Sequence, residues 1–252
     1  MTPKGEHRPL VVAHRGSSGT APENTMAAFH MAAAAGADMI EFDIRMTLDG
    51  EVVVHHDRRL GRTSNGSGRI RDLALVELRS LDAGAWYSRS FRGERIPMLR
   101  EVLHDLPRSL GMNIEVKTDG DGRRGSAMEK SIVRAVRDAR RSDSVLVTSF
   151  DHIFLRRFHR LDPGIQTGAL CLPIRDGLRS ASLIVRRIGA SAFICSRAQL
   201  RARHVHDAHA HGITIMTYGV NTLAALASAR RKGVDAVITN YPERMVRALR
   251  IA

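Results

Sequence analysis

Apolar and polar residues alternate strictly from residue 39 to residue 46, which is the pattern of a β-strand with two different faces. The apolar side chains are Ile40, Phe42, Ile44 and Met46, and the charged ones are Glu41, Asp43 and Arg45. Glu41 and Asp43 therefore point to the same side of the predicted strand. In an isolated strand such a polar face is usually exposed to solvent, so the rest of the chain has to decide its role.

A hairpin is predicted directly after this strand. Asp49 and Gly50 form a dipeptide that favours a two-residue turn, and the β-branched residues that follow return as the partner strand. In that register Asp43 faces His56 and shares its side of the sheet, while His55 points away. A turn longer by one residue would exchange the two histidines.

Further short apolar runs predict strands at regular intervals along the chain. Residues 10–13 form a buried run that ends in His14, and a helix capped by Asn24 or Thr25 follows it. Residues 112–118 alternate in the same way as the 39–46 segment, with Asn113, Glu115 and Lys117 on the polar side. The other predicted strands are residues 145–150, 167–172, 192–195, 213–218 and 236–239.

About eight strands alternate with helical patterns once the return arm of the hairpin is set aside. This order predicts an α/β protein with the TIM (β/α)8 barrel fold, and a doubly wound open sheet is the alternative. Both faces of a barrel strand are covered, so inward-facing acids near the carboxyl ends of the strands belong to an active site. Unpaired buried charges are costly, so these carboxylates need counter-charges.

The segment from residue 58 to residue 110 is long for a connection inside a compact domain. Such segments usually serve as a lid or a substrate wall. Within it Leu73, Val76 and Leu78 predict a short helix. Further on, Ser126 and Glu129 have the spacing of a capping box and predict the start of another helix.

The composition fits one cytoplasmic domain. With 252 residues, 43% of them hydrophobic, the chain can bury one large core. No run is long enough for a membrane helix, and no apolar core follows the charges at the start, so we expect neither a signal peptide nor stable membrane anchoring. Cys171 and Cys195 lie in apolar segments, where a thiol behaves as a small hydrophobe, and neither a disulfide nor a zinc site is expected.

The net charge of +13 raises the question of nucleic-acid binding. The basic residues are scattered and no nucleic-acid-binding motif accompanies them, so an arginine-rich surface without a nucleic-acid partner is favoured, and attraction of an anionic substrate is a third interpretation. Four histidines, at positions 204, 206, 209 and 211, could mimic a metal site. They fall on a helix that we predict to be exposed, so we assign them no ligand role.

Glu41, Asp43 and Glu115 supply oxygen ligands suited to one divalent ion, Ca²⁺ or Mg²⁺. With Arg15 and Lys117 nearby, the formal charge of the site is about −1, and a divalent ion changes it to about +1. Only the metal-loaded site would then attract a phosphodiester. In the alternative interpretation, Glu115 and Lys117 form a simple internal ion pair.

Two histidines complete this constellation. His14 and His56 could serve as the general base and the general acid of a phosphodiester cleavage, in either assignment. Arg15 and Lys117 would then offset the charge that develops on the phosphate in the transition state.

The chain resembles the glycerophosphodiester phosphodiesterase family over nearly its whole length. The resemblance begins at HRG (residues 14–16) with PENT (residues 22–25) and continues at EFDIRMTLDGEVVVHHD. Further blocks in the same order are RTSNGSG, DAGAWYSRSFRGERIPMLREVL, IEVK and GVDAVITNYPE. HRG alone is weak evidence, whereas these blocks in this order are highly specific.

The resemblance implies a hydrolase with a single TIM-barrel domain over residues 1–252 and a small insertion at about residues 58–97, after the hairpin of the second strand. It implies hydrolysis of small glycerophosphodiesters, such as glycerophosphocholine, to sn-glycerol 3-phosphate and an alcohol, a reaction of lipid and glycerol metabolism. A glycerol hydroxyl is thought to attack first in this family and to give a cyclic phosphate that water opens. The matching positions are His14 and His56 as acid and base, Glu41, Asp43 and Glu115 on the ion, and Arg15 and Lys117 on the phosphate.

One departure from the family pattern concerns the wall beside the substrate. Tyr218 stands in YGVN where relatives often carry tryptophan in WTVN, and we expect Tyr218 to contact the glycerol or the alcohol. Lysophospholipase D activity and phosphoinositide cleavage are rival activities, but the predicted insertion is rich in Arg, Ser and Gly rather than in apolar residues. A non-catalytic phosphate binder is a further rival, although it would need no acid and base pair. A monomer and a homodimer are both compatible with the sequence.

Overall fold

The computed structural model describes residues 8–118, 126–172 and 179–251. The charged start of the chain, on which the expectation about a signal peptide rests, lies outside these ranges. Within them, no helix is both long enough and apolar enough to cross a bilayer.

Eight parallel strands close into a barrel, which confirms the predicted fold. Neighbouring strands pair in the order β1-β9-β8-β7-β6-β5-β4-β2, and a direct pairing of β1 with β2 closes the ring. Their bounds are β1 Leu10–His14, β2 Met39–Met46, β4 Gly111–Val116, β5 Val145–Ser149, β6 Gln166–Leu170, β7 Ala192–Ser196, β8 Thr214–Tyr218 and β9 Ala236–Thr239. Strand β3, Val52–Val54, is antiparallel to β2 and lies outside the ring.

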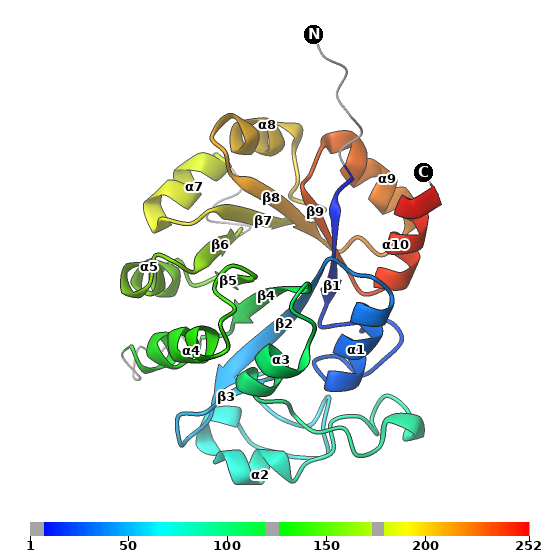
Figure 1. The fold of residues 1–252 in the computed structure, drawn as a ribbon, viewed down its shortest axis with the longest axis vertical. Coiled ribbons are helices and arrows are strands. Elements are labelled where there is room, and N and C mark those ends of the chain that lie inside the picture. Colours follow the sequence, from blue (N-terminus) through cyan, green and yellow to red (C-terminus); the bar gives the residue numbers. More distant parts are fainter. Residues whose placement is uncertain (1–7, 119–125, 173–178, 252) are drawn as a thin grey trace.

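Helices surround the strands on the outside of the barrel (Figure 1). The helices that follow barrel strands are α1 Met26–Ala34, α4 Ala127–Asp138, α5 His152–Leu161, α7 Ala181–Ile188, α8 Ala202–Ala210, α9 Leu223–Lys232 and α10 Pro242–Ile251. Thr25 caps α1, because its side chain accepts a hydrogen bond from the backbone of Ala28. The predicted capping box at α4 is wrong: Ser126 makes no side-chain cap bond, and Glu129 instead accepts from Arg157 at 2.8 Å.

The strand side chains divide into an outer and an inner layer. Odd positions of β1, such as Val11 and Ala13, pack outward against the helices, together with even positions of β2 such as Phe42. A separate apolar cluster fills the inside of the barrel: Val12, Leu146, Leu170, Ala192, Ile194, Met216, Ala236 and Ile238. The polar alternates of β1 and β2 therefore face inward, above this cluster.

The predicted register of the hairpin is wrong by one residue. Val54 pairs with Ile44, so Asp43 lies opposite His55 rather than His56, and the amide of His55 donates to the carbonyl of Asp43 at 2.9 Å. The turn is longer than predicted because the side chain of Asp49 accepts a hydrogen bond of 2.5 Å from Thr47. The connection between the two strands then holds three residues rather than two.

Residues 58–97 have a small apolar core of their own. The segment contains η1 Ile70–Asp72, α2 Leu75–Arg79 and η2 Arg89–Phe91, and α3 Leu99–Asp105 returns the chain to the barrel. Its buried cluster is Leu60, Ile70, Leu78, Ala83 and Ile96, and these side chains pack with Val53 of β3. In Figure 1 the segment with α2 lies beyond β3, outside the ring of helices.

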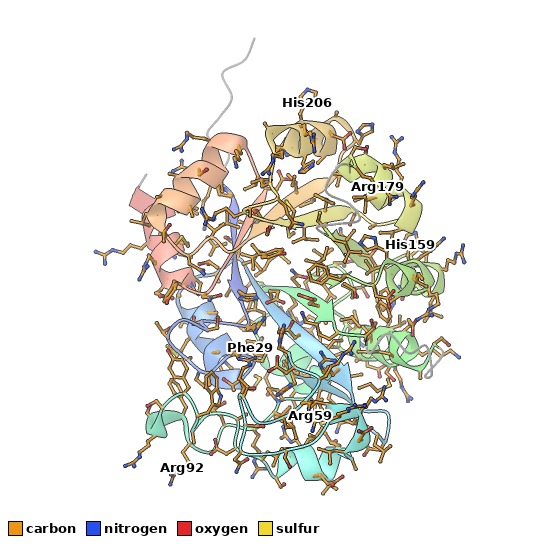
Figure 2. All side chains as sticks on the ribbon, turned by 180° about the vertical axis from the view of Figure 1, so that it is seen from behind. Phe29, Arg59, Arg92, His159, Arg179 and His206 are labelled. Atoms are coloured by element: carbon orange, nitrogen blue, oxygen red, sulfur yellow. The ribbon has the colours of Figure 1, made fainter. Side chains whose placement is uncertain are left out.

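Two expectations about single residues have different outcomes. Cys171 and Cys195 are both buried in the outer apolar layer, as predicted for thiols that act as hydrophobes. The helix α8 is not exposed all round, because His204 is buried against Phe193, with ring centroids 5.9 Å apart. His206 points to solvent on the opposite side of the helix (Figure 2).

Candidate active site

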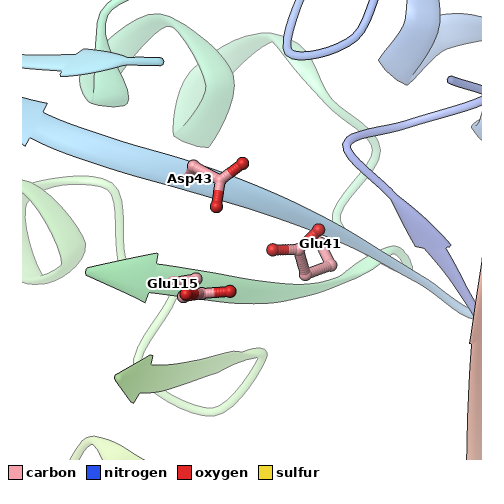
Figure 3. Close-up of side chains that lie close together, drawn as sticks. All are labelled: Glu41, Asp43 and Glu115. Carbon is pink, nitrogen blue, oxygen red and sulfur yellow. The ribbon is translucent and has the colours of Figure 1, made fainter. Parts of the chain in front are cut away.

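Three carboxylates meet inside the barrel at the carboxyl ends of β2 and β4. Asp43 is the register partner of Glu115, and Glu41 precedes Asp43 by two residues, so all three share the inward face. One oxygen of each lies within 4.8 Å of one of each of the others. Figure 3 shows the three side chains converging from the two neighbouring strands.

Two cations approach this carboxylate trio. Lys117 Nζ lies 3.1 Å from Asp43 Oδ1 and also donates a very short hydrogen bond to Glu115. Arg15 Nε lies 3.2 Å from Asp43 Oδ2, and the backbone N–H of Arg15 donates to Glu41 Oε2 at 3.0 Å. Asn24 donates to the same Asp43 oxygen at 2.9 Å. Asp43 is therefore the best-partnered member of the trio.

The loop after β1 is shaped to bring Arg15 to this place. Arg15 and Asn24 both adopt positive φ, at 55° and 60°, a conformation that side chains rarely take and that is concentrated at functional sites. Gly16 has φ 77°, and a Cβ there would lie 2.7 Å from the backbone of Ala28. The glycine of HRG is required by this close approach to α1.

The ionisation of the trio is uneven. Burial and then the charges of Asp43 and Glu115 raise the pKa of Glu41 well above its ordinary value, and burial and then Asp43 raise the pKa of Glu115. Burial opposes ionisation of Asp43 too, but Lys117 and Arg15 outweigh it and lower its pKa to about 2. The site is thus short of positive charge at Glu41.

This arrangement fits a divalent cation. Glu41 Oε1 is a buried oxygen without a hydrogen bond, which is costly unless a ligand satisfies it. It belongs to the carboxylate that converges with Asp43 and Glu115. Carboxylate oxygens are the donors that Ca²⁺ and Mg²⁺ prefer, so the donor set and the missing positive charge agree.

His14 stands at the end of β1 beside Glu41. The two residues are register partners, and His14 Nε2 lies 3.9 Å from Glu41 Oε2. On the other side of the ring, His14 Nδ1 lies 2.7 Å from the amide oxygen of Asn240. Burial and then the charge of Arg15 lower the pKa of His14, which favours the neutral ring.

His56 reaches the same cavity although its predicted register was wrong. β3 ends at Val54, so the chain is free to turn: His55 is 5% exposed, with Nε2 3.3 Å from Thr63 Oγ1, while His56 lines the cavity. Nδ1 of His56 lies 2.6 Å from Asp57 Oδ1. Burial lowers the pKa of His56, and the charge of Asp43 opposes this shift.

A chain of ion pairs connects the two sides of the site. Arg62 donates to Asp57 at 2.6 Å and to Glu23 at 2.9 and 2.7 Å, and Arg15 donates to Glu23 at 2.8 Å. Burial opposes ionisation of Asp57, but the hydrogen bonds from Arg62 and His56 lower its pKa. Asp57 is therefore a fixed negative charge behind His56.

The cavity has a volume of about 230 Å³ and contains seven of the eight site residues predicted from the sequence. These are His14, Arg15, Glu41, His56, Glu115, Lys117 and Tyr218. Asp43 is not part of the lining, but it forms ion pairs with Arg15 and Lys117, which are. Tyr218 lies on the wall formed with Phe150, Leu170 and Ile238. The structure thus brings all the predicted residues together in one place.

Several residues of the site were not singled out from the sequence. Asn113 lies beside Glu41 and accepts a hydrogen bond from Thr148 at 2.8 Å, and its place in the alternation of β4 was the available signal. Asn240 and Asp57 stand behind the two histidines, in the TNYPE and HHD blocks. Arg62 is the first residue of the RTSNGSG block, but its contacts with Asp57 and Glu23 depend on how residues 58–97 fold back.

Comparisons with known proteins agree with this geometry. Residues 14–244 match the glycerophosphoryl diester phosphodiesterase family. A glycerophosphodiester phosphodiesterase of Caldanaerobacter subterraneus subsp. tengcongensis is 33% identical over 242 residues, which cover 96% of this chain and 98% of that one. One from Bacillus subtilis (strain 168) is 31% identical over 252 residues, covering 94% and 85%. The structure of a phosphodiesterase from Oleispira antarctica in complex with the product sn-glycerol-3-phosphate is similar with a TM-score of 0.88, 28% identity and 97% coverage of both chains.

Proposed function

The chain belongs to the glycerophosphoryl diester phosphodiesterase family, and from this premise we propose that it hydrolyses glycerophosphodiesters to sn-glycerol 3-phosphate and an alcohol with the help of a divalent ion. The observation that carries the proposal is the carboxylate trio: three inward acids with oxygens within 4.8 Å of one another, flanked by two cations and two histidines. A site with this composition suits a negatively charged phosphate ester.

Glu41, Asp43 and Glu115 would hold the ion, Ca²⁺ or Mg²⁺. When bound, it supplies positive charge that polarises a phosphoryl oxygen and offsets the negative charge of the carboxylates. Arg15 and Lys117 bind the same phosphate from the sides, since both already stand at Asp43. Their fixed positions let them stabilise the charge that builds up in the transition state.

His14 is the group better suited to take a proton. Its Nδ1–H donates to the neutral oxygen of Asn240 at 2.7 Å, which leaves Nε2 free to accept, and the positive charge of Arg15 favours the unprotonated ring. His56 is backed by the carboxylate of Asp57, which stabilises the protonated ring. We therefore assign His14 as the general base and His56 as the general acid.

The chemistry follows from these two positions. His14 takes the proton of a glycerol hydroxyl as that oxygen bonds to phosphorus, and His56 gives a proton to the alcohol oxygen as its bond to phosphorus breaks. A cyclic phosphate results, and water opens it with the two histidines in exchanged roles. The net reaction consumes one water and yields sn-glycerol 3-phosphate and an alcohol.

Two finer proposals concern the parts around the site. We propose that residues 1–252 act as one domain in which residues 58–97 are an insertion that forms part of the substrate wall. This is supported by the hydrogen bond from Tyr87 to the carbonyl of Gly19, in the loop after β1, at 3.0 Å. We propose that Tyr218 contacts the glycerol, and its position in the cavity lining with Phe150, Leu170 and Ile238 supports this role.

A chelation assay tests the proposed function. Hydrolysis of glycerophosphocholine and several other glycerophosphodiesters, followed as release of sn-glycerol 3-phosphate, should stop in excess chelator and return when Ca²⁺ or Mg²⁺ is added in excess. The carboxylates need the ion because, without it, they repel a phosphodiester. A fully chelated sample that kept its rate would refute the role of the ion.

A further inference from the structure

Arg62 belongs to residues 58–97, but its side chain binds two carboxylates at the active site. Its Nε donates to Asp57 Oδ2 at 2.6 Å, and its two terminal nitrogens donate to the two oxygens of Glu23 at 2.9 and 2.7 Å. The pair with Glu23 is bidentate, which adds geometric specificity to the attraction of the charges. One planar guanidinium thus holds three oxygens from two separate parts of the chain.

Glu23 gives this guanidinium a fixed support on the barrel. Glu23 Oε1 also accepts a hydrogen bond from Arg15 at 2.8 Å, and Arg15 Nε lies 3.2 Å from Asp43 Oδ2. The side chain of Glu23 is only 14% exposed, whereas that of Arg62 is 47% exposed. Arg62 is therefore an exposed side chain that is anchored to an enclosed one.

The hydrogen bond from Arg62 to Asp57 acts on His56. Asp57 Oδ1 lies 2.6 Å from His56 Nδ1, so the carboxylate stands between the guanidinium and the imidazole ring. The side chain of Asp57 is 29% exposed, and a carboxylate in such a place samples several rotamers unless a partner holds it. With Nδ1 bound to Asp57, Nε2 is the ring nitrogen of His56 that can reach a substrate in the cavity. The orientation of the His56 ring therefore depends on where Arg62 holds Asp57.

We propose that Arg62 is a positioning residue for protonation of the leaving alcohol. It acts through Asp57, because a fixed carboxylate orients His56, whose Nε2 gives its proton to the alcohol oxygen as the bond from that oxygen to phosphorus breaks. This inference rests on the proposed function, in which His56 is the general acid. Exposed ion pairs contribute little to the stability of a fold, so a loss of Arg62 should affect the reaction more than folding.

The leaving group provides the test, because only a poor leaving group needs the proton. The two substrates are glycerophosphoethanol and glycerophospho-p-nitrophenol, assayed with Ca²⁺ or Mg²⁺ present. Ethanol leaves poorly unless its oxygen is protonated, whereas p-nitrophenolate is stable as an anion and leaves without help from an acid. The measured quantity is the ratio of kcat/KM for the ethyl ester to kcat/KM for the p-nitrophenyl ester. This ratio does not depend on how much of a preparation is folded.

Removal of Arg62 should lower this ratio. Arg62→Gln should lower it about 10-fold, which is part of the roughly 100-fold or more that a positioned general acid contributes, and His56→Ala should lower it further. Asp57→Ala should lower it at least as much as Arg62→Gln. If Arg62 acts through Asp57, adding Arg62→Gln to Asp57→Ala should change the ratio by less than about 2-fold, because two residues of one network are not additive.

Two further variants serve as controls. Arg79 lies in the same segment and also forms a bidentate pair with a glutamate, Glu101, at 2.8 Å, but this pair joins α2 to α3. Arg79→Gln should therefore leave the ratio unchanged, even if the protein becomes less stable. Arg62→Lys keeps the charge, but its single nitrogen cannot replace the planar guanidinium, so it should restore the ratio only in part.

The outcomes separate this inference from the proposed function. A ratio that falls in Arg62→Gln and in Asp57→Ala, but not in Arg79→Gln, supports the positioning role. Equal losses for both esters in Arg62→Gln, a further fall in the double variant, or full recovery in Arg62→Lys would overturn it while the function stands. A ratio that His56→Ala leaves unchanged would overturn the assignment of the general acid and this inference with it. If the wild type hydrolyses neither ester, the proposed function itself fails.

Discussion

At the scale of single residues, the two adjacent histidines show how neighbours in sequence acquire different roles. His55 is buried beside Thr63 of the 58–97 segment, whereas His56 lines the cavity that holds the carboxylates. The chain had to leave the hairpin geometry after Val54 for this to happen. A role in acid–base chemistry is therefore open to His56 alone of the two.

Replacement of each histidine by alanine tests this assignment. His56→Ala should lower kcat about 100-fold or more, because a positioned general acid typically contributes that much. His55→Ala should keep kcat within a few-fold of the wild type, although the loss of a buried side chain with hydrogen bonds should lower its melting temperature. Steady-state kinetics with thermal unfolding would measure both effects, and equal losses of kcat would show that the two roles are not separate.

The sequence predicted which side chains gather around the cavity better than it predicted the geometry that brings them there. Alternation along 39–46 and 112–118 was enough to place Glu41, Asp43 and Glu115 on one face, because side chains of parallel strands in register share a face. His56 was chosen on the basis of a wrong hairpin register. The dipeptide Asp49-Gly50 predicts a two-residue turn and gives no sign of the hydrogen bond from Thr47 to Asp49 in the longer turn. Contacts across the fold, such as Arg62 with Glu23, have no local pattern.

At the scale of elements, the end of α3 depends on a residue of a distant loop. Arg141, which is 2% exposed, follows α4 and donates hydrogen bonds to the carbonyls of Leu103 at 3.1 Å and Pro107 at 2.9 Å, and a very short one to that of Leu106. Helix ends leave such carbonyls without partners inside the helix. This one side chain therefore closes α3 and joins it to the α4–β5 connection.

Removal of this cap should destabilise the protein. Arg141→Met keeps much of the apolar volume but leaves three carbonyls without their donor, two of them in buried bonds, so the free energy of unfolding should fall by about 3 kcal/mol. The adjacent exposed Arg140 serves as the control, and Arg140→Met should change the free energy of unfolding by less than about 0.5 kcal/mol. Urea unfolding curves measure both, and similar values for the two variants would contradict the capping role.

The elements themselves were largely predictable, and their ends were not. Strands with continuous or alternating apolar residues appear where they were expected, because a barrel buries both faces of each strand. The predicted box of Ser126 and Glu129 failed because Glu129 pairs with Arg157 of the next helix. Tertiary partners override local capping preferences.

At the scale of the whole molecule, the carboxylate trio would link the stability of the barrel to the proposed ion. Three acids within 4.8 Å on two adjacent strands weaken the fold when no ion offsets their repulsion. A bound ion stabilises only the folded chain, because the unfolded chain separates these ligands. Binding should therefore be visible far from the site, in the unfolding of the entire barrel.

Thermal unfolding provides the test. Ca²⁺ or Mg²⁺ at about 100 times its dissociation constant should stabilise the wild type by about 2.7 kcal/mol. Glu41→Gln should raise the melting temperature of the metal-free protein, because it removes one of three repelling charges, and should abolish the response to the ion. Glu51→Gln, in an exposed pair with Arg100, is the control and should keep the response of the wild type.

The apolar cluster inside the barrel has one more consequence. Its side chains, which include Val12 and Ile238, fill the end of the barrel away from the carboxylates. The barrel interior is therefore closed at that end and is not an open channel. Substrate therefore enters, and products leave, on the carboxyl-terminal side of the barrel. A change made in the loops on that side acts on arrival and on departure together.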